Sequence, residues 1–194
     1  MKKIAVFASG SGTNFQSIVD SVHSGKLQAK VELLVCDKPD AFVIERAKAA
    51  GVATFVFNPK EYKSKPDFER EIAEELRNRG VDFLVLAGYM RLIGNVLLEH
   101  FPGRIVNIHP SLLPSFPGKD AIGQAIEAGV KVTGVTVHFV DEGMDTGPII
   151  AQEIVRISPF DNRTTLQQKI QDVEHTIYPE TLTHLFMTSM HKVQ

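Results

Sequence analysis

Residues 3–14 read Lys-Ile-Ala-Val-Phe-Ala-Ser-Gly-Ser-Gly-Thr-Asn, and this stretch predicts how the fold begins. Its first six residues are nearly all apolar and include β-branched side chains, which is typical of a buried strand. Gly10 and Gly12 then permit a tight turn, and residues 14–23 carry apolar side chains at helical spacing. The free amides and the positive dipole end of a helix N-terminus attract phosphate. The stretch therefore predicts a strand, a glycine turn and a helix, with an anion site where the helix begins.

Three interpretations of this turn stay open from the residues alone: phosphate binding, dinucleotide binding and a plain strand-to-helix turn. A dinucleotide fingerprint needs a third glycine or alanine, and Phe15 stands at that position. Asp37, however, ends the next predicted strand, where such folds place the acid that binds a ribose. The lysine of a Walker motif is absent.

Short apolar runs and amphipathic segments alternate along the rest of the chain. We expect strands at residues 3–8, 31–36, 52–57, 82–87, 104–108, 133–140 and 147–157. We expect helices at residues 14–23, 66–79, 95–100, 121–128 and from 163 onward, and one that Asp40 caps and Gly51 ends. Nearly continuous apolar strands separated by helices indicate a parallel sheet covered on both faces. The last two strands follow each other with little helix between them, so they are expected to be antiparallel additions.

The length and composition predict a single α/β domain over residues 1–194, with a Rossmann-like, mostly parallel sheet and the most hydrophobic strand, 82–87, at its centre. Twenty-one basic and 23 acidic side chains leave a net charge of −2, which argues against a general nucleic-acid or membrane-surface binder. The single cysteine, Cys36, excludes an internal disulfide and a cysteine-rich zinc site, and we expect it to be buried. Neither a signal peptide nor a membrane span is evident, so the expected location is the cytoplasm.

Ligands bind beyond the carboxyl ends of strands in open α/β sheets, so the residues after the first, fourth, fifth and sixth strands are candidates. Residues 87–91 after the fourth strand suit a pocket wall, although Arg91 taken alone is equally well explained as a solvent-exposed side chain. Asn107 and His109 stand two apart, so in an extended chain they point the same way. An amide can stabilise a carbonyl oxygen that gains negative charge, and an imidazole can move protons. The alternative is a polar strand end followed by a stiff, proline-containing loop.

Three acids, Asp141, Glu142 and Asp145, follow the sixth strand. They suit either a solvated turn or a carboxylate that orients and charges His109. Their spacing does not fit a calcium loop. His138 lies inside the strand and is either structural or part of the site. The sequence has no Gly-x-Ser-x-Gly elbow and no His-x-x-x-His pair, so it shows neither a covalent nucleophile nor a zinc hydrolase motif.

Two runs, Asn-Ile-His-Pro-Ser-Leu-Leu-Pro at 107–114 and Gly-Val-Thr-Val-His-Phe-Val-Asp-Glu-Gly-Met-Asp-Thr-Gly-Pro at 134–148, resemble the folate-dependent formyltransferase family. The segments at 9–16 and 174–179 extend the resemblance over nearly the whole chain. They match members of the family whose acceptor is glycinamide ribonucleotide. The resemblance implies formyl transfer from 10-formyltetrahydrofolate to the amine of that nucleotide, with small-molecule partners only and no metal.

The resemblance also implies a role for individual residues. The phosphate would bind in the N-terminal half, and the folate and catalytic elements would begin at about residue 88. The implied catalytic residues are Asn107, His109 as general acid, and Asp145, which keeps His109 charged. The implied nucleotide-binding residues are Gly12, Thr13, Asn14 and Glu174. The implied folate-binding residues are Lys65, Met90, Arg91, Leu92, Ile93 and Asn107. Lys65 stands where members of the family often carry arginine; it keeps the charge but lacks the planar fork of a guanidinium.

Three other functions are alternatives to this one. Formyl transfer to methionyl-tRNA usually involves an extra C-terminal domain, for which 194 residues and a charge of −2 leave no room. Hydrolysis of formyl-folate by the same residues usually accompanies an added N-terminal regulatory domain, whereas the first strand here starts at Lys3. A nucleotide-binding module or an NAD-linked oxidoreductase would use the glycine turn without formyl transfer, and the missing third glycine argues against it.

Overall fold

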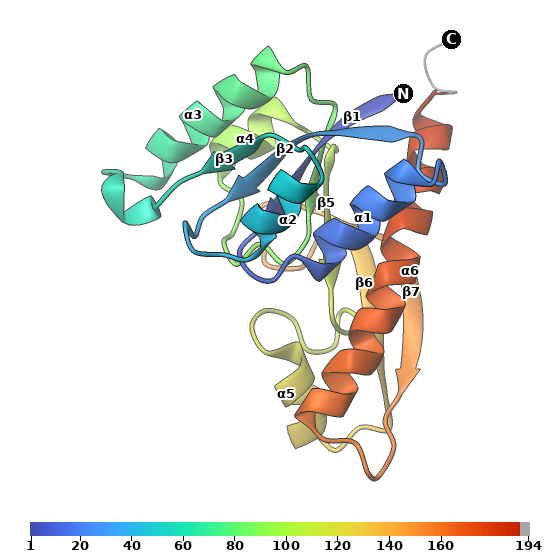
Figure 1. Cartoon of the computed structure of the whole chain (residues 1–194). Coiled ribbons are helices and arrows are strands. Elements are labelled where there is room, and N and C mark those ends of the chain that lie inside the picture. Colours follow the sequence, from blue (N-terminus) through green and yellow to red (C-terminus); the bar gives the residue numbers. More distant parts are fainter. Residues whose placement is uncertain (191–194) are drawn as a thin grey trace.

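The computed structural model describes residues 1–190, and within them seven strands form one sheet (Figure 1). The order across the sheet is β3-β2-β1-β4-β5-β6-β7. The strands are β1 Lys2–Ala8, β2 Ala29–Cys36, β3 Thr54–Val56, β4 Phe83–Leu86, β5 Ile105–His109, β6 Val132–Phe139 and β7 Ile149–Arg156. Strands β1 to β5 are parallel, and β6 is antiparallel to β5 and β7. This confirms the predicted sheet, with the fourth strand at its centre.

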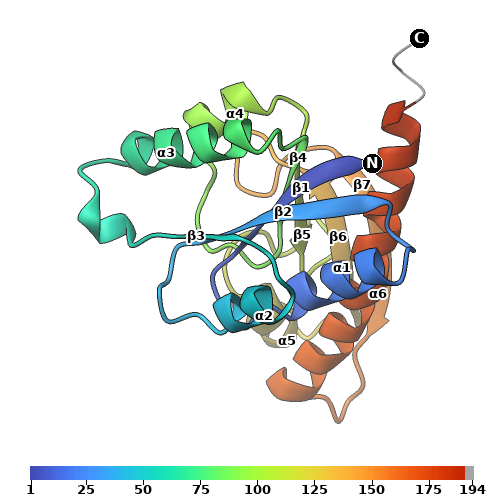
Figure 2. The same ribbon diagram turned by 45° about the horizontal axis from the view of Figure 1, so that its top comes forward.

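Helices cover both faces of the sheet (Figures 1 and 2). One face carries α3, Lys65–Asn78, and α4, Asn95–His100, and the other carries α1, Thr13–His23, α2, Val43–Ala49, and α6, Arg163–Met190. The short helix α5, Ala121–Glu127, lies against α6. In β1, Ile4 and Val6 pack toward α1 while Ala5 and Phe7 pack toward α3. Burial of both faces explains why the central strands are continuously apolar in the sequence.

Helix α6 is fastened to the sheet by a buried tyrosine. Tyr178 is fully buried, and its hydroxyl oxygen lies 2.8 Å from the carbonyl oxygen of Leu86 and 3.1 Å from that of Val106. A hydroxyl has one hydrogen, so the two carbonyls share it. Leu86 belongs to β4 and Val106 to β5, so this contact joins α6 to the two strands that lead into the loop after β4 and to Asn107.

The structure differs from the sequence prediction at α2 and β3. Asp40 is not the cap of the second helix, because α2 begins at Val43 with Phe42 in the N-cap position. The Val43 amide instead donates to the carbonyl of Gly10, so the helix start is set by a contact with the loop after β1. The third strand is also shorter than the predicted 52–57, and a single 3-10 turn, Pro59–Glu61, follows it.

Replacing Tyr178 by phenylalanine removes the hydroxyl while keeping the ring. The two carbonyls then lose a buried donor, so we expect the free energy of unfolding to fall by about 1–3 kcal/mol. Tyr62→Phe is the matched control, because the Tyr62 hydroxyl donates to Glu71 at the surface, and a change of less than about 0.5 kcal/mol is expected there. Urea denaturation measures both values, and equal losses in the two variants would contradict the role of Tyr178.

Candidate active site

A cavity of about 880 Å³ opens where the loops after β1, β4 and β5 meet. This volume is in the range of small-molecule sites. Helix α6 and the loops around residues 118–122 and 140–145 complete the wall. The cavity lies beside the β1–β4 junction, where the order of the parallel strands reverses, as expected for an open α/β sheet. The strand-end residues predicted from the sequence therefore converge on one space.

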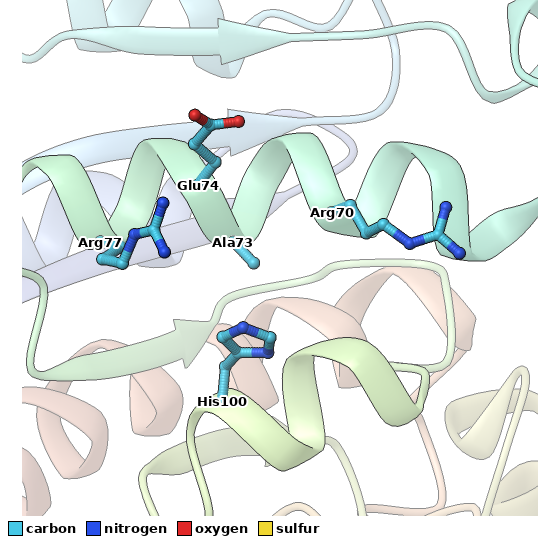
Figure 3. Close-up of a pocket in the computed structure, with 5 residues that line it drawn as sticks. All are labelled: Arg70, Ala73, Glu74, Arg77 and His100. Carbon is cyan, nitrogen blue, oxygen red and sulfur yellow. The ribbon is translucent and has the colours of Figure 1, made fainter.

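A smaller hollow of about 200 Å³ lies between α3 and α4 and is lined by Arg70, Ala73, Glu74, Arg77 and His100. Figure 3 shows His100 pointing from α4 toward Ala73, while Glu74 points away from α4. Arg70 is already paired with Asp67. None of the polar strand ends reaches this hollow, so the larger cavity is the candidate active site.

The glycine turn forms one wall of the cavity, with Gly10 to Asn14 along its lining. Gly12 has a φ of 75°, and a Cβ atom added there would clash with Val43 of α2, so a side chain does not fit. Gly12 is also the N-cap of α1, and neither a side-chain cap nor an acidic residue occupies the first turn. Arg46 of α2 holds the turn from outside by donating from Nε to the Ser11 carbonyl at 2.8 Å. The N-terminus of α1 is thus uncapped at the cavity wall, and an uncapped helix N-terminus suits an anion.

Asn14 and Glu174 meet on this side of the cavity, joining α1 to α6. The Asn14 amide donates from Nδ2 to Glu174 Oε2 at 2.9 Å, and both side chains are buried. Burial raises the pKa of Glu174 to about 7, although the hydrogen bond from Asn14 opposes the shift. Gln167 and Gln171 line the same wall, and sequence reasoning missed them. Gln167, Gln171 and Glu174 follow one another at intervals of four and three residues, which places them on one face of a helix. This spacing is the signal that could have identified the two glutamines.

His109 lies at the carboxyl end of β5 and is only 5% exposed. Its Nε2 atom is 2.9 Å from the carbonyl oxygen of Phe116, and its Nδ1 atom is 3.4 Å from Asp145 Oδ2. A carbonyl and a carboxylate oxygen only accept hydrogen bonds, so a ring protonated on both nitrogens satisfies both partners. Asp145 Oδ2 also accepts from the Gly118 amide at 2.7 Å. The carboxylate therefore joins the two loops that flank the histidine.

Asp145 reaches His109 from a loop and not from the end of a strand. Strand β6 is antiparallel, and its last residue, Phe139, pairs with Val106, three residues before His109. Residues 140–148 connect β6 to β7, and it is this connection that carries Asp145 to the histidine. The predicted residue lies at the site, but the loop places it there and not the end of the strand.

His138 contacts Asn107, which the sequence left undecided. Its Nδ1 atom lies 2.8 Å from the Phe139 carbonyl oxygen, so Nδ1 carries the hydrogen. Burial lowers the pKa of His138 and favours the neutral ring, although the Phe139 carbonyl and Asp145 oppose the shift. The bare Nε2 atom therefore accepts from Asn107 Nδ2 at 3.2 Å. This contact turns the amide nitrogen of Asn107 toward His138 and uses one of its two hydrogens.

The segment after β4 forms the opposite wall and contains Met90, Arg91, Leu92 and Ile93. Met90 and Leu92 are largely exposed, and Ile93 is buried. Arg91 is not simply solvated, because its Nε atom donates to Asp37 Oδ2 at 2.8 Å. Asp37 is buried, each of its oxygens accepts a hydrogen bond from Ser9 or Arg91, and it does not line the cavity. The carboxylate is thus closed to a ribose, which removes the main support for dinucleotide binding.

Lys65 is the one predicted site residue that lies outside the cavity wall. It is the first residue of α3, and a Cβ atom added to Gly94 would come within 2.9 Å of its Cε atom. Lys65 therefore lies beside the end of the segment after β4. Among residues 1–190, no cluster of His, Cys, Asp or Glu side chains is arranged to hold a metal ion, and no helix there has the length and hydropathy of a membrane span.

Comparisons with known proteins agree on one family. A model of the family described as formyl transferase matches residues 2–182. Phosphoribosylglycinamide formyltransferase of Bacillus subtilis is 56% identical over 185 residues, covering 95% of each chain. The crystal structure of glycinamide ribonucleotide transformylase 1 from Geobacillus kaustophilus has a TM-score of 0.94 at 62% identity, covering 95% of this chain and 98% of that one. The trifunctional purine biosynthetic protein adenosine-3 of Drosophila melanogaster is 41% identical over 186 residues, covering 95% of this chain and 14% of that protein.

The raised pKa of Glu174 predicts how stability depends on pH. The ordinary value is 4.5 and the folded value about 7, so the folded state holds a proton that the unfolded chain releases between these values. The resulting stabilisation is complete below pH 4.5 and is lost as the pH rises through 7, about 3 kcal/mol in all. Glu174→Gln cannot ionise and keeps an acceptor for Asn14.

We therefore expect the free energy of unfolding of Glu174→Gln, relative to the unmodified protein, to rise by about 3 kcal/mol between pH 4.5 and pH 8. Urea denaturation at the two pH values measures this difference. Effects of the other titrating groups are common to both proteins and cancel. A difference that does not change with pH would show that Glu174 is not held neutral by burial.

Proposed function

Because the chain belongs to the formyl transferase family, we propose that it transfers the formyl group of 10-formyltetrahydrofolate to the amine of glycinamide ribonucleotide. The products are formylglycinamide ribonucleotide and tetrahydrofolate, a step of de novo purine synthesis. One observation supports this function above the others. A single cavity contains both the uncapped N-terminus of α1 and the Asn107–His109–Asp145 set.

The nucleotide would bind between α1 and α6. Its phosphate would lie against the amides of Gly12, Thr13 and Asn14, which line the cavity where the helix dipole and free donors favour an anion. Glu174, held by Asn14, faces the same part of the cavity and would contact the body of the nucleotide. Burial raises the pKa of this carboxyl to about 7, which reduces the negative charge beside the phosphate relative to an ordinary glutamate.

The folate would bind along the wall after β4, with Met90, Arg91, Leu92 and Ile93 beside its ring system. Met90 and Leu92 expose apolar surface to the cavity mouth, which suits a flat aromatic ring. Lys65 lies beside Gly94, beyond this wall. In this arrangement Lys65 would contact the carboxylates at the far end of the folate.

In the proposed reaction the nucleotide amine attacks the formyl carbon, and the carbonyl electron pair moves onto oxygen. Asn107 Nδ2 donates its second hydrogen to this oxyanion, and protonated His109 supplies the neighbouring positive charge. The bond from the formyl carbon to the folate nitrogen then breaks. The folate nitrogen takes a proton, and the former amine loses one, so charge and atoms balance. Both nitrogens of His109 are engaged, so proton donation to the substrate requires the contact between Nε2 and Phe116 to open.

Release of tetrahydrofolate tests the proposed function. We expect release from 10-formyltetrahydrofolate only when glycinamide ribonucleotide is present, because the amine is the nucleophile. Absorbance change of the folate, with and without the nucleotide, measures this. Release without nucleotide would indicate the hydrolase, and no release in either case would indicate a binding module; both would contradict formyl transfer.

Asn107→Ala removes the donor to the oxyanion. We expect kcat to fall by about 10²–10³ while both substrates still bind, since one such donor typically contributes that factor. Asp145→Ala is expected to lower kcat as well, because His109 loses its carboxylate partner. Steady-state kinetics with Asn78→Ala, at an exposed position of α3, provides the control. Unimpaired turnover in Asn107→Ala or Asp145→Ala would contradict these roles.

A further inference from the structure

Three neighbouring strand ends are joined by a chain of polar contacts beside the cavity. Asp37 follows β2, Ser9 follows β1, and Met90 and Arg91 follow β4. Ser9 Oγ donates to Asp37 Oδ1 at 2.5 Å, and Arg91 Nε donates to Asp37 Oδ2 at 2.8 Å. The Met90 amide donates to Ser9 Oγ at 2.9 Å. The backbone of Met90, through Ser9, and the side chain of Arg91 are thus both linked to the Asp37 carboxylate.

The carboxylate also sets the direction of the hydrogen bonds. Both Asp37 oxygens only accept, so the single hydrogen of Ser9 is directed toward Asp37. The lone pairs of Ser9 Oγ are then left for the Met90 amide. The Asp37 side chain is only 3% exposed, whereas Arg91 is 40% exposed, so the acid lies in the interior and the arginine at the cavity. Asp37 and Ser9 themselves do not line the cavity.

We propose that Asp37 and Ser9 are positioning residues, which hold residues 88–93 in the backbone shape that binds formyl-folate. This inference rests on the proposed function, because it assigns that wall to the folate. Neither residue touches the substrate; both act through Met90 and Arg91. Without the contacts, the segment populates other conformations, and the apparent affinity falls in proportion to the fraction that remains competent.

The effect is expected on one substrate only. Gly12, Thr13 and Asn14 form the start of α1, and Glu174 lies on α6. None of these four residues makes a hydrogen bond to Asp37 or Arg91. Loss of the contacts should therefore raise the KM for formyl-folate and leave the KM for the nucleotide and the kcat at saturating folate nearly unchanged. General destabilisation would instead lower the active fraction and change kcat.

The test uses Asp37→Asn, Ser9→Ala and the double variant. An asparagine at position 37 is uncharged and has one acceptor oxygen in place of two, so it accepts from either Ser9 or Arg91 but not from both. With its oxygen toward Arg91, its amide nitrogen donates to Ser9 Oγ and competes there with the Met90 amide. We expect each single variant to raise the formyl-folate KM about tenfold, with the nucleotide KM and kcat within about twofold. Because Ser9 and Asp37 act through one chain of contacts, the double variant should be little worse than Asp37→Asn alone.

Hydrogen exchange of the Met90 amide gives a readout that is independent of catalysis. Ser9→Ala removes the acceptor of this amide, so we expect its exchange to accelerate at least about tenfold, and Asp37→Asn to accelerate it as well. Asp82→Asn is the matched control. Asp82 joins the opposite ends of β1 and β4 by accepting from the Lys3 amide at 2.8 Å, and neither readout should change there.

Unchanged exchange at Met90 together with an unchanged formyl-folate KM would overturn the proposal, as would equal increases in both KM values. A wild-type protein with no nucleotide-dependent turnover would contradict the proposed function instead. In that case hydrogen exchange of the Met90 amide is the only test of the positioning role. Loss of protection from exchange in both single variants supports that role, and retained protection rejects it.

Discussion

The reversal of strand order between β1 and β4 is the constraint on which the site depends. The chain leaves β1 through α1 toward β2 on one face, and it returns through α3 on the other face to β4. Right-handed crossovers in opposite directions require the helices to lie on opposite faces. The loops after β1 and β4 therefore diverge, and a cavity opens between them. Strand β5 then extends the same edge and adds Asn107 and His109.

Polar groups buried around this cavity are kept in defined states by their partners. Asp145 accepts from Gly118 and faces His109, while His138 donates to a backbone carbonyl and accepts from Asn107. Burial favours the neutral forms of His138 and Glu174. A donor fixed in this way, such as the Asn107 amide, needs no rearrangement when charge develops on a substrate, which favours electrostatic stabilisation. His109 differs, because its Nε2 atom must first leave the Phe116 carbonyl.

The sequence predicted the elements well because burial on two faces leaves a direct mark on it. Central strands are apolar over their buried length, and helices show one apolar face, so β1, β4 and α1 are evident. The start of α2 was missed because a hydrogen bond from Val43 to Gly10, distant in sequence, overrides the local signal of Asp40. Local propensity does not contain such tertiary contacts.

The main residues of the candidate site could also be predicted from the sequence, but their hydrogen-bond partners could not. Strand-end logic and the family resemblance identified Asn107, His109 and Asp145, which the structure brings to one cavity. The contact of His138 with Asn107 depends on the register of β5 with β6, which the residues alone do not specify. The partners of Asp37 depend on three strand ends meeting, so the residues alone left a ribose-binding role open for it.

The most direct test of the proposed formyl transfer is a crystal structure with glycinamide ribonucleotide and a formyl-folate analogue bound together. We predict the phosphate against the amides of Gly12, Thr13 and Asn14, and the analogue carbonyl oxygen within about 3 Å of Asn107 Nδ2. The nucleotide amine should then face the carbonyl carbon. A phosphate bound away from α1, or a carbonyl directed away from Asn107, would contradict the assignment of this cavity as the site of formyl transfer.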